Sequence, residues 1–162
     1  MPSLSRRLSV SLLILGAPLC AALALERAAS SHAAPPVRFF DAPSQAAEFI
    51  GYNRSITLTA KQKKVRDKAL AAMPAACCDK FSEATCCCPC NLAKSVWGLS
   101  NYLIARQDAT VPELQTAVKG WMKFVNASGF SGDACDTPGG CGRAFSQGGC
   151  GGMDEGNLVA AR

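Results

Sequence analysis

Residues 74–91 read PAACCDKFSEATCCCPCN and place six cysteines within fourteen positions. Adjacent cysteines seldom bridge each other, because a disulfide requires a particular dihedral angle and Cα separation. Cys86, Cys87 and Cys88 would therefore each need a partner elsewhere in the chain. Disulfides alone would be hard to arrange for six cysteines packed this closely. The stretch therefore predicts a loop whose thiols carry the function.

Helical patterns lie upstream of this loop, and no segment of the chain shows the alternation typical of a strand. A short helix is expected over residues 45–50, followed by a longer one over 60–73. Thr59 is the expected N-cap of the longer helix, and Pro74 is expected to stop it.

Two further helices are expected downstream. Asn91 is the expected cap of a helix that runs to about Arg106, with an apolar stripe along one face. Thr110-Val-Pro-Glu113 is a capping box with proline in the first turn, and it opens a helix that runs to Val125. A short connection near residues 107–110 predicts an antiparallel pair. The predicted fold is mainly α, a small helical bundle with a cysteine-rich loop.

The N-terminal stretch has the pattern of a targeting segment. Arg6 and Arg7 precede an almost wholly apolar run over residues 8–25, and small-residue cleavage options follow. We expect a signal peptide over residues 1–33, of ordinary or twin-arginine type, and therefore a periplasmic or secreted protein. An uncleaved leader would instead anchor the protein, since the run is close to the ~18-residue lower limit of a membrane-spanning helix.

The remaining sequence divides into three parts. Two prolines mark residues 34–42 as a linker, and residues 43–128 form the helical cysteine-rich domain. Residues 129–162 form a Gly/Cys-rich tail, in which nine glycines fall between Gly129 and Gly152. Such a tail buries little apolar surface, so we expect it to be irregular and to need pinning by disulfides or a metal. Its three cysteines are expected to fasten it over the helices; they are Cys135, Cys141 and Cys150.

Several function classes are disfavoured by composition. The residues after position 33 carry a net charge of +3, which is too small to indicate nucleic-acid binding. His32 is the only histidine and lies in or beside the leader, so the rest of the chain has no imidazole. The carboxylates are scattered, and Asp79 and Glu83 are expected to be solvated loop residues. An acid–base hydrolase is therefore not favoured, and an enzyme of any kind is the weaker hypothesis.

The placement of the last loop cysteines favours thiolate chemistry. Cys87-Cys88-Pro89-Cys90 is a C-x-P-C sequence directly before an expected helix, whose positive end lowers the pKa of a nearby thiol. Thiolates select soft ions such as copper(I), zinc, iron–sulfur clusters or mercury. The usual zinc and ferredoxin spacings are absent, so copper(I) is favoured. The predicted metal ligands are Cys77, Cys78, Cys86, Cys87, Cys88 and Cys90.

The sequence thus predicts an exported carrier or scavenger of copper(I) or another thiophilic metal, and its protein partner stays open. Two alternatives remain. Cys87 and Cys90 resemble the thioredoxin active site and would serve a thiol–disulfide oxidoreductase, although the strand that precedes that site in thioredoxin is not expected here. An export compartment is usually oxidising, so a disulfide-stapled structural or interaction domain is the other alternative. Nine cysteines remain without Cys20, and an odd number leaves one thiol over.

A family resemblance agrees with export. Ala72-Met73-Pro74, the cysteine-dense loop and the later helix that opens at Thr110 resemble the bacterial exported proteins named for a Pro-Cys-Tyr-Cys-Gly-Cys (PCYCGC) motif. The resemblance covers about residues 65–125. This chain has Pro-Ala-Ala-Cys-Cys where that motif alternates its cysteines. The resemblance implies an exported, cysteine-centred domain and no particular activity.

Overall fold

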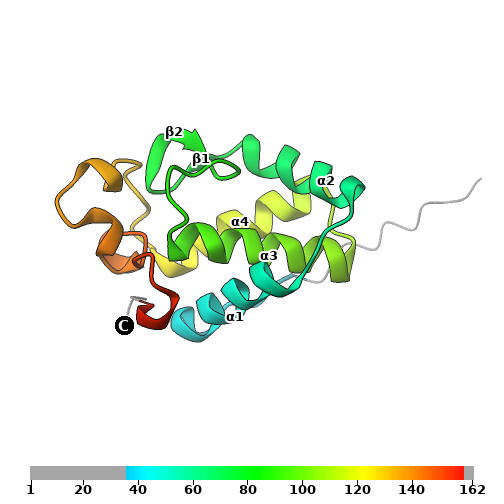
Figure 1. Ribbon diagram of the computed structural model, residues 1–162, viewed down its shortest axis with the longest axis horizontal. Coiled ribbons are helices and arrows are strands. Elements are labelled where there is room, and N and C mark those ends of the chain that lie inside the picture. The colour runs from blue at the N-terminus through cyan, green and yellow to red at the C-terminus, as the bar shows by residue number, and fades with distance from the viewer. Residues whose placement is uncertain (1–35, 159–162) are drawn as a thin grey trace, which may run out of the picture. The chain divides into compact units, whose positions relative to one another are not determined.

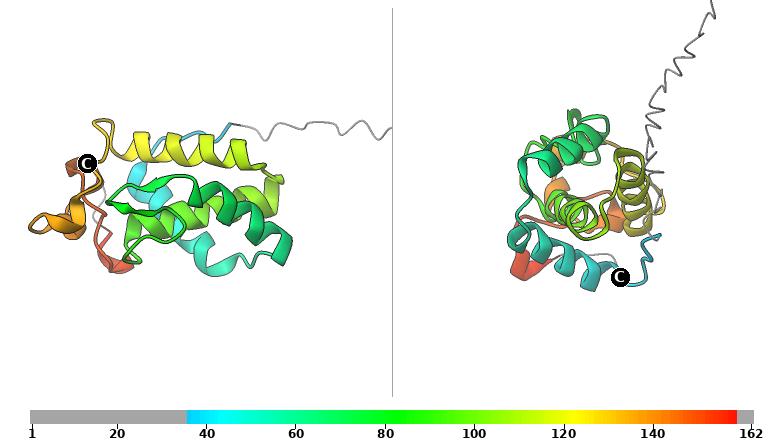
Figure 2. Two further views of the ribbon diagram at one scale, coloured as in Figure 1. Left: turned by 90° about the horizontal axis from the view of Figure 1, so that it is seen from above. Right: turned by 90° about the vertical axis from the view of Figure 1, so that its right-hand side faces the viewer.

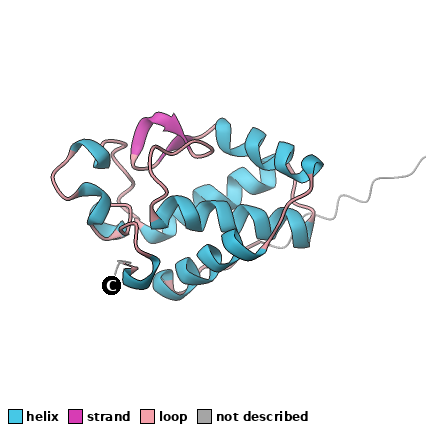
Figure 3. Ribbon diagram, viewed as in Figure 1, coloured by secondary structure: helices cyan, strands magenta, loops and turns pink. Residues whose placement is uncertain are grey.

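The computed structural model describes residues 36–158, and the expected leader over residues 1–33 lies outside this range (Figure 1). Four α-helices, four short 3₁₀ helices and one two-stranded hairpin make up the regular structure of the described residues, so the predicted mainly α fold is confirmed (Figure 3). None of the helices in residues 36–158 has the length and apolar character needed to cross a membrane.

Polar caps start the first two helices. Asp41 accepts a hydrogen bond from the Ser44 N–H at 2.7 Å and begins α1 (Ala42–Ser55), which is much longer than the helix expected over 45–50. The extra residues are polar or small, so they gave little apolar periodicity. α2 (Ala60–Ala71) begins as expected, with a capping box between Thr59 and the side chain of Gln62.

A hairpin occupies the first part of the cysteine loop, where no strand was expected. α2 stops before Pro74, and β1 (Pro74–Ala75) then pairs antiparallel with β2 (Cys78–Ser82). Ala75 lies opposite Cys78, so only two residues form the turn. The sequence prediction was wrong here because strands this short cannot show a period of two.

The second pair of helices follows the loop. α3 (Asn91–Gln107) is capped by Cys90 rather than by Asn91, which is already helical. Asp108 adopts the left-handed conformation with φ 50°, and the chain reverses into α4 (Val111–Val125). The predicted capping box is confirmed, because the Thr110 N–H donates to Glu113 at 2.8 Å.

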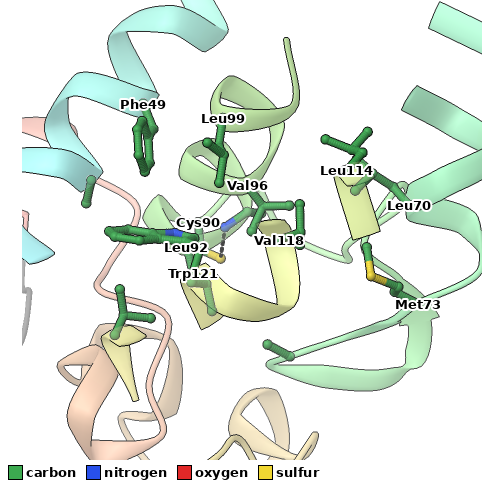
Figure 4. Close-up of a cluster of buried hydrophobic side chains, with 14 of the residues drawn as sticks. Phe49, Leu70, Met73, Cys90, Leu92, Val96, Leu99, Leu114, Val118 and Trp121 are labelled. Carbon is green, nitrogen blue, oxygen red and sulfur yellow. Dashed lines mark hydrogen bonds between the residues drawn. The ribbon is translucent and has the colours of Figure 1, made fainter. Parts of the chain in front are cut away.

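The core lies between α1, α3 and α4 and extends to α2. Trp121 is fully buried, and its ring meets that of Phe49 edge-on with centroids 5.0 Å apart (Figure 4). α1 lies so close to α3 that a Cβ on Gly98 would be 1.6 Å from the Phe49 carbonyl oxygen. Glycine is therefore required at this crossing. Cys90 lies at the edge of the same core, beside Leu92 (Figure 4).

The tail runs past one end of the helices, beside the start of α3 and the hairpin (Figures 1 and 2). It has no long helix or strand in its described part, residues 129–158, as expected for its glycine content. It consists of turns and four short 3₁₀ helices, which are η1 (Ala134–Asp136), η2 (Gly140–Gly142), η3 (Phe145–Gln147) and η4 (Glu155–Asn157).

Candidate metal centre

The hairpin and the start of α3 place the six loop cysteines at one end of the bundle. Cys77 lies in the tight turn of the hairpin, and Cys78 is the first residue of β2. Cys90 is the N-cap of α3. Cys86, Cys87 and Cys88 lie in the irregular segment between β2 and α3. The turn and the helix cap thus close the loop on itself and direct its thiols to a common place.

Backbone hydrogen bonds bring the tail to the same place. The Cys135 N–H donates to the Cys77 carbonyl at 3.2 Å, and the Leu92 N–H donates to the Cys150 carbonyl at 3.0 Å. The Gly152 N–H donates to the Cys141 carbonyl at 2.8 Å. The first N–H groups of a helix have no partner within it, and here tail carbonyls accept from two of them in α3. Each tail cysteine therefore lies next to the loop.

The sulfur atoms of the two segments lie in contact. The Sγ–Sγ distance is 3.4 Å between Cys77 and Cys86, and 3.3 Å between Cys87 and Cys135. Cys141 follows at 3.6 Å from Cys135. Bonds of 2.3 Å to one tetrahedral ion would hold its sulfur ligands about 3.8 Å apart. The sulfurs are thus close enough together to bind a common ion, and the nine cysteines of the described residues are all free thiols.

Three overlapping groups of sulfurs are each tight enough to hold a metal ion. Within each group all ligand atoms lie within 4.8 Å of one another, and no carboxylate joins any group in the described residues. The groups are Cys77, Cys86, Cys88 and Cys90; Cys78, Cys87 and Cys135; and Cys88, Cys135 and Cys141. Cys150 hydrogen-bonds with Cys77 and Cys90, so all nine sulfurs form one continuous cluster. Such a cluster can hold metal ions or oxidise to disulfides.

Cys90 is the member of the cluster that most favours the thiolate. Hydrogen bonds from the sulfurs of Cys150, Cys77 and Cys86 lower its pKa well below the usual range. The Ala93 N–H at the start of α3 also donates to its Sγ, at 3.5 Å. The expected thiol at a helix N-terminus is therefore present, although at Cys90 alone.

The neighbours of Cys90 keep their protons more tightly. Contact with the sulfurs of Cys150, Cys86 and Cys90 raises the pKa of Cys77. Burial raises the pKa of Cys88, and the negative charge of Cys90 adds to this effect. Closely packed thiols resist a second negative charge until a cation neutralises the first. Metal binding here would therefore displace protons.

Glu83 differs from the sequence expectation. Asp79 is exposed as expected, but Glu83 is 1% exposed, and its carboxylate accepts a hydrogen bond from the Ala76 N–H at 2.8 Å. Burial raises the pKa of Glu83 to about 7, and the charge of Cys90 contributes to the shift. The side chain binds the backbone of the hairpin turn. Its role is thus to hold the loop that carries Cys77.

The structure brings the six predicted ligands into the cluster but separates the C-x-P-C pair. Cys87 belongs to a group with Cys135, whereas Cys90 belongs to a group with Cys77. Sequence reasoning treated the tail cysteines as fasteners and missed that their sulfurs join the cluster. Two features of the sequence pointed to this contact. The glycine-rich tail needs cross-links to become ordered, and the loop holds more thiols than it can pair within itself.

Searches of protein-family models, curated proteins and solved structures found no match to this chain. The resemblance to the exported PCYCGC proteins thus stays a prediction.

Proposed function

We propose that this protein binds copper(I) through the thiolates of its cysteine cluster and acts as an exported carrier or scavenger of the ion. The observation that carries the proposal is the convergence of eight sulfurs from two separate segments, in groups whose sulfur atoms lie within 4.8 Å of one another. Sulfur-only sites select soft ions such as copper(I). Export is part of the proposal through the expected leader.

The size of the sulfur groups favours copper(I) over zinc. Structural zinc sites use four ligands in a closed tetrahedron. Two of the three groups here contain three sulfurs, and Cys88 and Cys135 each belong to two groups. Copper(I) accepts two or three thiolates and readily shares them between neighbouring ions. The shared sulfurs therefore support a cluster of copper(I) ions better than isolated zinc sites.

The geometry supports ion binding over dithiol exchange at Cys87 and Cys90. Exchange requires both sulfurs of a pair to come together during the cycle. The partner of Cys87 is Cys135 in the tail, at 3.3 Å, whereas Cys90 is fully buried against other sulfurs. The C-x-P-C sequence thus places its two thiols in different parts of the cluster.

A competition titration tests the proposal. Reduced protein of residues 36–162 is titrated anaerobically with copper(I) in the presence of a coloured copper(I) chelator. We expect more than one ion per chain to be withheld from the chelator. Replacing Cys77, Cys86, Cys88 and Cys90 by serine should weaken retention about 10- to 100-fold or more.

Met153→Leu is the control, because it removes an exposed sulfur that is not a cysteine thiol. Circular dichroism establishes that each variant keeps its helices. The proposal is wrong if the unaltered protein leaves all copper with the chelator, or if the serine variant with intact helices retains as much as the control.

A further inference from the structure

Two of the sulfur groups differ in their exposure to solvent. One has two buried and two half-buried members, and the other contains the exposed Cys87 beside the buried Cys78 and the half-buried Cys135. Cys90 is fully buried and Cys77 is 1% exposed, whereas Cys87 is exposed to solvent. We call Cys77, Cys86, Cys88 and Cys90 the inner group, and Cys78, Cys87 and Cys135 the outer group. The two groups share no sulfur, so each can hold an ion without competing for ligands.

A chain of sulfurs connects the two groups. Cys87 lies 3.3 Å from Cys135 and 4.0 Å from Cys88, which is a member of the inner group. Cys88, Cys135 and Cys141 form the third group, and it overlaps both others. An ion at the surface can therefore move inward by replacing one sulfur at a time, without ever losing all of its ligands.

Two contacts between β2 and the tail lie beside the outer group. The Asp79 N–H donates to the Gly132 carbonyl at 2.8 Å, which ties β2 to the tail beside Cys78. Lys80 pairs with Asp136 at 3.3 Å next to Cys135. Cys87 is the one member of the outer group that is exposed to solvent. An incoming thiolate can therefore approach it.

We propose that the outer group is the exchange port of the cluster, where copper(I) passes between Cys87 and the thiolate of an external carrier. This inference rests on the proposed function. In the step, the carrier's copper–sulfur bond breaks as the Cys87–copper bond forms, and the released carrier thiolate takes up the proton of the Cys87 thiol. The oxidation state of copper does not change. The ion then moves through the shared sulfurs to the inner group.

The rate of loading tests the port. Copper(I) is presented as its glutathione complex in one arm, and on a short Cys-x-x-Cys peptide in the other. We expect Cys87→Ser to slow loading about tenfold or more in at least one arm, because exchange depends on the access of the attacking sulfur to the carrier's copper ion. The affected arm identifies the class of carrier. Loading of the inner group should still reach completion.

Met153→Leu is the control, since it removes an exposed sulfur that is not a cysteine thiol. It should leave both the rate of loading and the retention of copper unchanged. The port is disproved if Cys87→Ser loads at the unaltered rate in both arms. If the unaltered protein takes up no copper(I) in either arm, the proposed function itself fails.

A second measurement needs no variant. With one equivalent of copper(I) bound, brief alkylation followed by mass spectrometry should leave the inner group unmodified and label Cys87 first. Under the proposal the inner group fills first, because it offers four sulfurs, two of which, Cys77 and Cys90, are buried away from competing water and thiols. Protection of Cys87 ahead of Cys77 and Cys90 would contradict the division into port and inner centre.

Discussion

The helical body, residues 42–125, and the tail, residues 129–158, become ordered by different means. The body buries large apolar side chains such as Trp121, Leu99 and Leu114 and has capped helices. The tail contributes one large, fully buried apolar side chain, Phe145, and otherwise relies on hydrogen bonds and sulfur contacts. We therefore expect the body to fold mainly on apolar burial, and the order of the tail to depend on the state of the cluster.

The largest expected effect lies in the body. Trp121→Ala removes a fully buried ring between α1 and α3, and we expect it to cost about 3–5 kcal/mol of unfolding free energy. Denaturant unfolding of the reduced protein measures this loss. Phe81→Ala is the control, because Phe81 is 43% exposed. A similar small loss for both variants would show that the body does not depend on this core.

Glu83 lies in the cysteine loop, which contacts the tail, and it makes the free energy of unfolding depend on pH. Its folded-state pKa is about 7, above the ordinary value of 4.5. Between these values the folded protein binds more protons than the unfolded chain, so the unfolding free energy falls as pH rises from about 4.5 to 7. The expected fall is roughly 3 kcal/mol.

Glu83→Gln should remove most of this fall, since the amide oxygen can still accept from the Ala76 N–H. Unfolding of reduced, metal-free protein at several pH values measures it. Asp79→Asn is the control, because Asp79 is exposed. An unchanged pH profile in the Glu83 variant would contradict a buried, largely neutral carboxyl group in the folded state.

Copper loading should affect the two regions differently. Metal bound by the folded state stabilises whatever its ligands hold together. We expect amide hydrogen exchange in residues 129–158 to slow about tenfold or more on loading, while α4 changes little. Serine at Cys135 and Cys141 should abolish the effect in the tail. Equal changes in tail and body would show that the tail does not order separately.

The smallest effect is expected at the surface contact between the regions. Glu155 pairs with Lys94 at 3.0 Å and also with Arg54, and all three side chains retain solvent contact. Exposed ion pairs contribute about 0–1 kcal/mol. Glu155→Gln should therefore change the unfolding free energy by less than about 1 kcal/mol, as measured by denaturant unfolding at low and high salt. A larger loss would mean that charge, and not sulfur, holds the tail.

Local signals predicted the body well and the cluster only in part. The capping residues Thr59 and Thr110 marked two helix starts, because their hydrogen bonds are made within one turn. The N-cap at Cys90 was missed, since Asn91 is the better intrinsic cap and tertiary contacts decided against it. Cys135 lies far from Cys87 in sequence, and only the docked tail shows that their sulfurs meet.

Protein purified from its native compartment offers the most direct test of a thiolate metal cluster. Free thiols are counted before and after removal of metal with a chelator under denaturing conditions, and elemental analysis is run on the same sample. We expect bound copper, few reactive thiols in the folded protein, and nine thiols after chelation without reductant if the leader has been removed. A sample without metal, whose thiols appear only after reduction, would contradict the account and identify a disulfide-stapled domain instead.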